Sequence, residues 1–349
     1  MPCSYTTREM MTAVSTALPY NGFLANTFFQ GSKTHIAEVI EVDVKKGRRR
    51  MAPFVSPRRG GKIMTRDGFH TNMIRCPKIA PETILTVDDV TKRAFGENVY
   101  SRNTPEQRRD QLLAQDLNDL QESIERRKGW MARQVILDGG FDVVDEEEGI
   151  DIHVDYGFTN KEVLTGDDVW SKGGSDPDEI LLEKRLEILK SSGVCPNMMI
   201  GDAKTIRLYM KHPLIQKNAN LLNIKDARIE PRIVNDNVTF YGRIASLDLD
   251  IYSYDEWFID DDTKKEMPMI PYGTIILANS GGIGTWHYGA VSQVEQGVGL
   301  QTYEAEIVPK FTVDEKNDLE TLRETSRPLP VPDDVDSWAV IIVDKQAEG

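Results

Sequence analysis

Cysteine is scarce in this sequence, and its scarcity excludes several classes of protein. The three cysteines, Cys3, Cys76 and Cys195, are far apart and odd in number. They predict no disulfide framework and indicate a reducing compartment. No apolar run is long enough to cross a bilayer as a helix, so we expect no membrane association. The first residues lack a basic region followed by an apolar core, so no secretory signal is predicted.

Motifs for catalysis and cofactor binding are also missing. The five histidines are scattered, and none is spaced with cysteine as in a zinc site. Gly60–Lys62 lacks the upstream glycine and the following Ser or Thr of a phosphate loop, and no G-x-S-x-G elbow occurs. Asp260–Asp262 is read as a solvated turn, because no Gly or Glu follows at calcium-loop spacing. We therefore expect no catalytic residue, no metal and no cofactor.

The chain is large and acidic. Its 349 residues allow two or three domains, and 40% hydrophobic residues allow sizeable cores. The net charge of −14 argues against a protein that coats nucleic acid and is typical of a soluble, self-repelling chain.

One long helix is predicted over residues 105–138. Thr104 is a suitable N-cap, Pro105 suits the first turn, Gln107 completes a capping-box spacing, and Gly139 marks the end. At 1.5 Å per residue this helix would be about 50 Å long. Its narrow apolar stripe predicts that it packs on a single sheet, formed by strands near residues 150 and 340. The stripe consists of Leu113, Leu117, Leu120, Ile124, Met131 and Val135.

Residues 45–66 carry nine basic residues and no acidic one. Removing these nine charges from the net −14 leaves the rest of the chain at −23. Proline and glycine interrupt the stretch, and strand-like flanks predict a long two-stranded excursion that ends near Thr86. Its basic residues include Arg48, Arg49, Arg50, Arg58, Arg59 and Lys62.

Three interpretations of this basic stretch remain open. It docks on an acidic surface of a neighbouring copy, it is a solvated loop, or it binds nucleic acid and loses affinity with salt. We favour docking, because the rest of the chain is so acidic. The candidate counter-surface is Asp142–Asp155, and its densest run is Asp145, Glu146, Glu147 and Glu148.

From residue 177 onward, helices and strands alternate. Asp176 caps a predicted helix that ends at Gly193, and Asp202 caps another over residues 203–211. A mobile loop follows the strand 274–278 and contains Gly281, Gly282 and Gly284. The prolines of residues 328–332 predict a link between the last two strands. An α/β enzyme using residues 177–300 is the alternative function for this region.

An ordered set of short motifs runs through nearly the whole chain. The set includes Ala52–Pro57 with the basic turn after it, Arg108-Arg109 at the start of the long helix, Pro271–Asn279 and the Pro328–Val331 segment. In this order the sequence resembles the lambda-type major capsid protein E family of tailed phages, which has the Hong Kong 97 (HK-97) capsid fold.

The resemblance implies an α+β, HK-97-like capsid fold in which the long helix is the spine of a P-domain and Gly281, Gly282 and Gly284 belong to the axial loop of an inserted A-domain. The implied parts are an N-terminal arm with a first strand (1–47), an E-loop hairpin (48–86), a P-domain (87–170), an A-domain (171–301) and returning P-domain strands (302–349).

The function implied by the resemblance is structural. The chain would assemble with itself into hexamers and pentamers of an icosahedral head that packages double-stranded DNA without sequence specificity. Scaffolding and portal proteins would be partners, and a decoration protein is a further candidate. The expected location is the virion capsid, and the host cytoplasm during assembly.

Overall fold

The computed structural model describes residues 7, 10–11, 22–44, 70–91, 104–145, 149–172, 174–221, 232–244, 246–260, 263–295 and 298–345. The helices are α2 (Phe23–Phe28), α3 (Val87–Thr91), α4 (Pro105–Asp138), α5 (Pro177–Ser191), α6 (Ala203–Lys211) and α7 (Pro213–Leu221). The strands of the first half are β1 (Phe29–Thr34), β2 (Val39–Val44), β3 (His70–Arg75), β4 (Glu82–Thr86), β5 (Gly140–Asp145), β6 (Ile150–Asp155), β7 (Lys161–Val163) and β8 (Met198–Gly201). The strands from residue 232 to 278 are β9 (Arg232–Asn235), β10 (Val238–Ile244), β11 (Leu249–Tyr254), β12 (Trp257–Ile259), β13 (Glu266–Pro268) and β14 (Thr274–Ala278). The remaining strands are β15 (Gly284–Tyr288), β16 (Val291–Glu295), β17 (Gly299–Tyr303), β18 (Val308–Asp314), β19 (Leu319–Thr325), β20 (Pro328–Pro332) and β21 (Ala339–Ile342).

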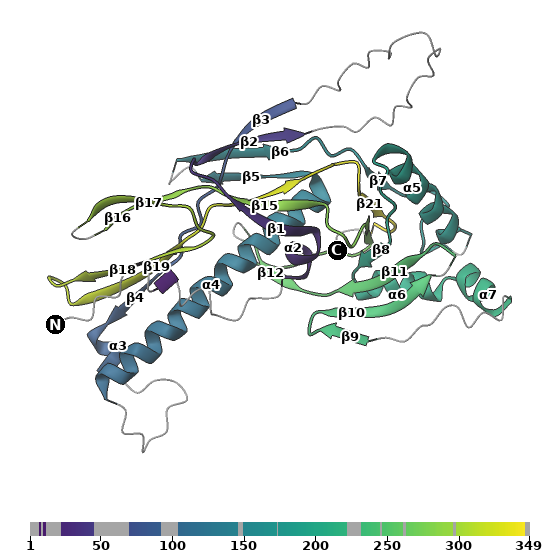
Figure 1. The fold of residues 1–349 in the computed structure, drawn as a ribbon. Coiled ribbons are helices and arrows are strands. Elements are labelled where there is room, and N and C mark those ends of the chain that lie inside the picture. The colour runs from purple at the N-terminus through teal and green to yellow at the C-terminus, as the bar shows by residue number, and fades with distance from the viewer. Residues whose placement is uncertain are drawn as a thin grey trace, which may run out of the picture.

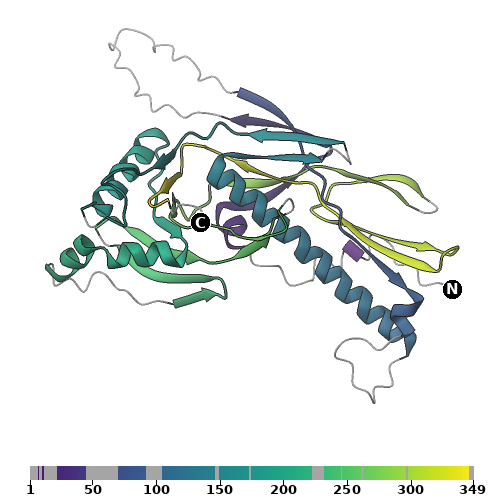
Figure 2. The same ribbon diagram turned by 180° about the vertical axis from the view of Figure 1, so that it is seen from behind.

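Helix α4, the spine helix, begins and ends at the predicted residues. The Thr104 hydroxyl accepts a hydrogen bond from the Gln107 backbone N–H, and the Gln107 side chain accepts one from the Thr104 N–H. Gly139 ends the helix in the left-handed conformation, with φ of 79°. Figures 1 and 2 show the helix running from the middle of the molecule, beside α2, to the far end, where α3 and β4 lie. Local capping chemistry therefore sets both ends of the longest element.

Replacing Thr104 with alanine is expected to lower the free energy of unfolding by about 1 kcal/mol, because it removes the hydroxyl that accepts the hydrogen bond from the Gln107 backbone N–H. Urea unfolding of the unassembled subunit measures the change. Thr104→Ser keeps the hydroxyl and serves as the control. Equal stability of the Ala and Ser variants would show that the hydroxyl at position 104 contributes nothing to stability.

The largest sheet has seven strands, in the order β7-β21-β14-β8-β11-β10-β9. Side chains that alternate along its strands enter two separate cores. Ile275 and Leu277 of β14 pack with Leu181 of α5 and Tyr209 of α6. Ile276, from the same strand, packs in the core that contains α2 and the C-terminal half of α4. The sheet is therefore covered by α5 and α6 on one face and by α2 and α4 on the other.

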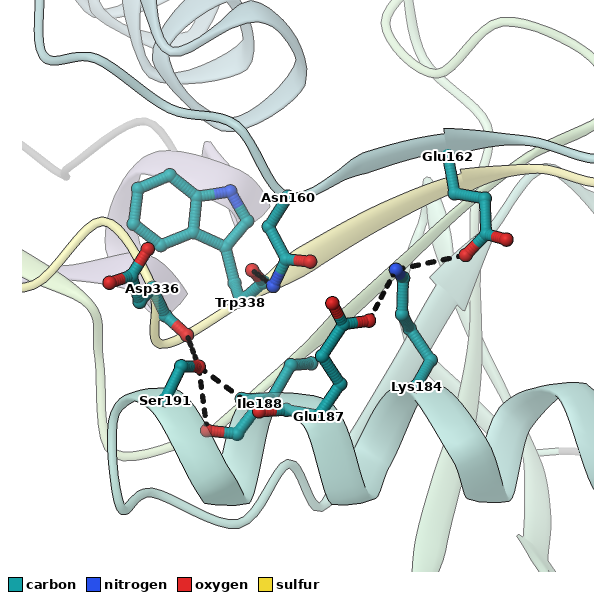
Figure 3. A network of polar contacts seen from close by, with 8 residues as sticks. All are labelled: Asn160, Glu162, Lys184, Glu187, Ile188, Ser191, Asp336 and Trp338. Atoms are coloured by element: carbon teal, nitrogen blue, oxygen red, sulfur yellow. Dashed lines mark hydrogen bonds and ion pairs between the residues drawn. The ribbon is translucent and has the colours of Figure 1, made fainter.

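Polar contacts fasten α5 to the sheet edge and to the segment before β21 (Figure 3). Lys184 lies 2.9 Å from a carboxylate oxygen of Glu162 on β7 and 2.6 Å from one of Glu187. Ser191 donates to the Asp336 carbonyl at 3.4 Å. These contacts hold the helical layer against strands from two distant parts of the chain.

The spine helix does not pack on one sheet formed by strands near residues 150 and 340, as the stripe predicted. β6 pairs with β5, whereas β21 lies in the seven-stranded sheet. Val154 of β6 and Val340 of β21 nevertheless share one core with Met131 and Val135 of the helix. The stripe is thus buried by several small elements, including α2, and the prediction of a single sheet was wrong.

The predicted boundary between the P- and A-domains cuts through sheets. β7 and β21, which were assigned to the P-domain, are paired strands of the seven-stranded sheet. β15, which was assigned to the A-domain, pairs instead with β1 and β20. β4, placed at the end of the hairpin, pairs with β19. Long-range pairing, which no local pattern encodes, accounts for these differences.

The segment Pro328–Pro332 is strand β20 and not a link. It pairs with β15 and lies at the edge of a three-stranded sheet in the order β1-β15-β20. Proline lacks an N–H but is tolerated on an edge strand. All five residues are buried, so the segment belongs to the core.

Candidate subunit-contact surfaces

A two-stranded ribbon, β2 with β3, forms the base of the predicted E-loop hairpin. The strands pair antiparallel, from Val39 opposite Arg75 to Val44 opposite His70. Residues 45–69 therefore connect the far ends of the ribbon. The predicted contact residues Arg48, Arg49, Arg50, Arg58, Arg59 and Lys62 lie outside the described residues.

The two faces of this ribbon differ in burial. Ile40 and Ile74 are buried in the main core. Val39 and Met73 are exposed, Met73 to 72%. An anchored ribbon with apolar side chains on its outer face can support a contact with another chain.

The acidic counter-surface belongs to the ribbon β5–β6. Asp145 is the last residue of β5, and Glu146, Glu147 and Glu148 lie outside the described residues. Further along the ribbon, Asp142 is hydrogen-bonded to Nδ1 of His153. This hydrogen bond, followed by the negative charge of Asp142, raises the pKa of His153. Exposed Asp142 and Asp151 keep this part of the ribbon acidic.

Burial of the apolar stripe increases along the spine helix, from its N-terminal end to its C-terminal end. Leu120, Ile124, Met131 and Val135 are buried. Leu113 and Leu117 are half-buried. Leu120 packs with Met10 of the N-terminal region and Leu322 of β19, in a small separate core.

Of the three glycines predicted for a mobile axial loop, Gly282 and Gly284 lie against other elements, whereas Gly281 is exposed. Gly284 is the first residue of β15, and a Cβ there would collide with the backbone of Val331. The N–H of Ile283, between Gly282 and Gly284, donates to the Phe28 carbonyl at 2.7 Å. Gly281 donates its N–H to the Asn279 side chain at 2.7 Å. Gly284 therefore permits close backbone approach to β20, and the placement of the three glycines in an axial loop stays a prediction.

The N-terminal region reaches the β16–β17 hairpin, a contact that no motif in the sequence indicated. Thr7 donates its hydroxyl to a carboxylate oxygen of Glu295 at 2.5 Å, and Tyr303 donates to the same oxygen at 2.6 Å. These two hydrogen bonds, that of Thr7 first, lower the pKa of Glu295. On the hairpin, Val294 and Leu300 are exposed to 61% and 70%. The hairpin thus presents apolar side chains to its surroundings while the N-terminal region holds it.

Within the described ranges, the structure offers little for chemistry. They contain no group of three or more His, Cys, Asp or Glu side chains placed to hold a metal ion. None of the helices described there is long and apolar enough to cross a membrane. A groove of about 610 Å³ lies between β7 and α5, lined largely by carboxylates such as Glu179 and Glu183.

The long spine helix, the ribbon hairpin and the mixed sheet with its helical layer together form the HK-97-like capsid fold. The crystal structure of a prophage protein from Escherichia coli CFT073 superimposes with a TM-score of 0.72 at 17% identity, covering 97% of this chain and 99% of that one. A phage-related protein from Bordetella bronchiseptica RB50 superimposes with a TM-score of 0.53 at 12% identity, covering 95% and 94% of the two chains.

Residues 6–343 match the family described as phage major capsid protein E, and the chain belongs to this family. It is 23% identical to the major capsid protein of Enterobacteria phage P21, over 97% of this chain and 99% of that one. It is 20% identical to the major capsid protein of Escherichia phage lambda, over 83% and 85% of the two chains. The protein is therefore a structural capsid protein of the virion and not an enzyme.

Proposed function

We propose that this chain assembles with itself into hexamers and pentamers of the icosahedral head of a tailed phage, which packages double-stranded DNA. The match of residues 6–343 to the capsid family carries the proposal. Closed shells need heterologous contacts between copies, and extended elements that leave the subunit body supply such contacts. The β2–β3 ribbon and the β16–β17 hairpin are elements of this kind.

The basic residues of the E-loop, Arg48 to Lys62, dock on an adjacent copy, and Asp145–Glu148 is one acidic surface available to them. The helical layer with α5–α7 lies nearer the local axis of each ring, and the P-domain with the spine helix meets its neighbours at the threefold axes. The opposite charges of the basic E-loop and of Asp145–Glu148 would fix the register of docking and accelerate association. The net charge of −14 suits a shell that must not grip its DNA.

Further partners follow from the same proposal. Scaffolding and portal proteins guide assembly in the host cytoplasm, and packaged DNA meets the shell without sequence specificity. A decoration protein is a candidate partner of the finished shell.

Size-exclusion chromatography and negative-stain electron microscopy of the expressed chain test the proposal. Rings, capsomers or closed shells are expected, with or without a co-expressed scaffolding protein. Small monodisperse particles under every assembly condition would contradict it.

The double variant Arg58→Glu, Arg59→Glu is expected to abolish or strongly reduce assembly, because it reverses two charges in the stretch that docks on a neighbour. The thermal unfolding of the unassembled subunit should stay nearly unchanged. The matched control is Lys264→Glu with Lys265→Glu, two adjacent exposed lysines of the β12–β13 hairpin. Loss of fold in the arginine variant, or equal assembly of both variants, would reject the docking of this stretch.

A further inference from the structure

Arg323 and Thr325 project from the same face of β19, because side chains alternate along a strand, and Arg327 follows two residues later, just after the bridge between Ser326 and Ile79. The Nε of each arginine and the Thr325 hydroxyl are buried without a hydrogen-bond partner among the described residues. Thr325 is 1% exposed and Arg327 is 9% exposed. Buried polar groups are normally hydrogen-bonded. Three unpartnered donors in one short stretch therefore indicate a missing acceptor.

Lys78 adds a fourth cationic or polar group. The backbones of Ile79 and Ser326 exchange two hydrogen bonds of 2.9 Å. Lys78, just before Ile79, and Arg327, just after Ser326, therefore lie on neighbouring chain segments. Burial, and then the positive charges of Arg323 and Arg327, lower the pKa of Lys78. Both arginines are thus close enough to Lys78 to disfavour its charged form.

Negative charge at this face is limited. Glu38 lies 2.9 Å from Arg327 and 3.6 Å from Arg75, so one carboxylate is shared between two arginines. In the sheet register, Arg323 stands between Glu82 of β4 and Lys310 of β18, whose opposite charges offset each other. The face keeps uncompensated positive charge on a chain whose net charge is −14.

The donors fit an oxyanion. Guanidinium N–H groups and a hydroxyl bind carboxylate or phosphate through charge-assisted hydrogen bonds. Nucleic acid fits this site less well, because proteins bind it with many cations along a continuous surface. Here Glu38 and Glu82 lie beside the arginines and interrupt the positive charge. A single carboxylate can accept hydrogen bonds of this kind and brings one negative charge to a face that is positive.

We propose that Lys78, Arg323, Thr325 and Arg327 form an oxyanion site that receives a carboxylate from a second copy of this chain. The inference rests on the proposed function, since an assembling subunit meets its own copies. The chain supplies many carboxylates, with 56 Asp and Glu residues against 42 Lys and Arg residues. Contact with a second copy would satisfy donors that the isolated subunit leaves without partners.

Sulfate is the probe for the site in the unassembled subunit. Thermal unfolding is compared in sodium sulfate and sodium chloride at equal ionic strength. The Tm gain in sulfate is expected to shrink by at least half in Arg323→Gln and in Thr325→Val, and to persist in the control Lys316→Gln, an exposed lysine of the β18–β19 turn. An equal gain in all four proteins would overturn the site.

Thr325→Val separates binding from structure. It removes an unpartnered hydroxyl at nearly constant volume, so the Tm of the isolated subunit in chloride should stay unchanged or rise. Assembly should nevertheless require a several-fold higher subunit concentration, as measured by light scattering, and more so when Thr325→Val is combined with Arg323→Gln. If Thr325 only stabilises the fold, Thr325→Val should lower the Tm of the isolated subunit and leave the concentration needed for assembly unchanged.

The outcomes separate this inference from the proposed function. If the wild-type chain never assembles, the proposed function fails, whereas the sulfate experiment still decides whether the site exists. If the wild type assembles and the double variant assembles at the same concentration, a second copy does not occupy the site. Loss of duplex-DNA binding in the variant without any loss of assembly would assign the site to nucleic acid and overturn the proposal.

Discussion

Replacing Trp338 with alanine is expected to lower the free energy of unfolding by about 3–5 kcal/mol, the range typical of a large aromatic lost from a core. Trp338 is fully buried, and its indole N–H donates to the Ile136 carbonyl near the end of the spine helix at 3.0 Å. Its ring stacks on Phe158, with centroids 4.8 Å apart and an angle of 6°. Its own carbonyl accepts a hydrogen bond from Asn160 at 2.9 Å (Figure 3). Trp338 thus joins the spine helix to the segment that leads into β7 and to the one that leads into β21.

Chemical unfolding of the unassembled subunit measures this loss. Trp338→Phe keeps an aromatic ring against Phe158 but loses the indole donor, so its loss should be clearly smaller than that of the alanine variant. Assembly of Trp338→Ala should fail at temperatures where the wild type assembles, since the subunit itself is destabilised. A loss below about 1 kcal/mol would show that the site collapses around the cavity.

Glu324→Gln is expected to stabilise the subunit in alkaline solution. Glu324 is fully buried on β19, and neither carboxylate oxygen has a hydrogen-bond partner among the described residues. Burial raises the pKa of Glu324 to about 8. Between its ordinary pKa and this raised value, the folded chain keeps a proton that the unfolded chain releases. The free energy of unfolding therefore falls as the pH rises from about 4.5 to about 8, by about 1.4 kcal/mol per pH unit, and then levels off.

Urea unfolding at a series of pH values tests this sign. The glutamine variant lacks the titration, so its advantage over the wild type should grow from near zero at pH 5 to about 4 kcal/mol at pH 9. The control is Glu320→Gln on the same strand, which removes one negative charge from an ion pair of 2.7 Å with Arg109. A difference between wild type and Glu324→Gln that does not change with pH would show that Glu324 is ionised throughout.

Helix ends were predictable because the signals that set them are local. The caps at Thr104, Asp176 and Asp202 all form, and each lies within three residues of the backbone group that it binds. Sheet neighbours were not predictable in the same way. β1 pairs in parallel with β15, and the partners Phe29 and Gly284 are far apart in the sequence. Pairing of this kind depends on the whole fold, so residues 328–332 were misread as a link although they form strand β20.

The class of protein could be predicted from the order of short motifs, but the proposed oxyanion site could not. The basic stretch stands out by charge alone, whereas Arg323, Thr325 and Arg327 lie in or just after an ordinary mixed strand. The alternation of arginine, threonine and arginine places three donors in one short stretch, which is the signal that could have been noticed. Their lack of partners is visible only when the neighbouring chain segments are in place.

Strand β21 has a consequence for the order in which the molecule is made. It lies between β7 and β14, and its residues Ala339 to Ile341 are buried in the two cores that flank the sheet. A ribosome adds this strand after every other described strand, so the sheet stays open at β14 until β21 has been made. Chains that are cut short lack the strand that joins β7 to the sheet. Only chains that include β21 can therefore complete the seven-stranded sheet.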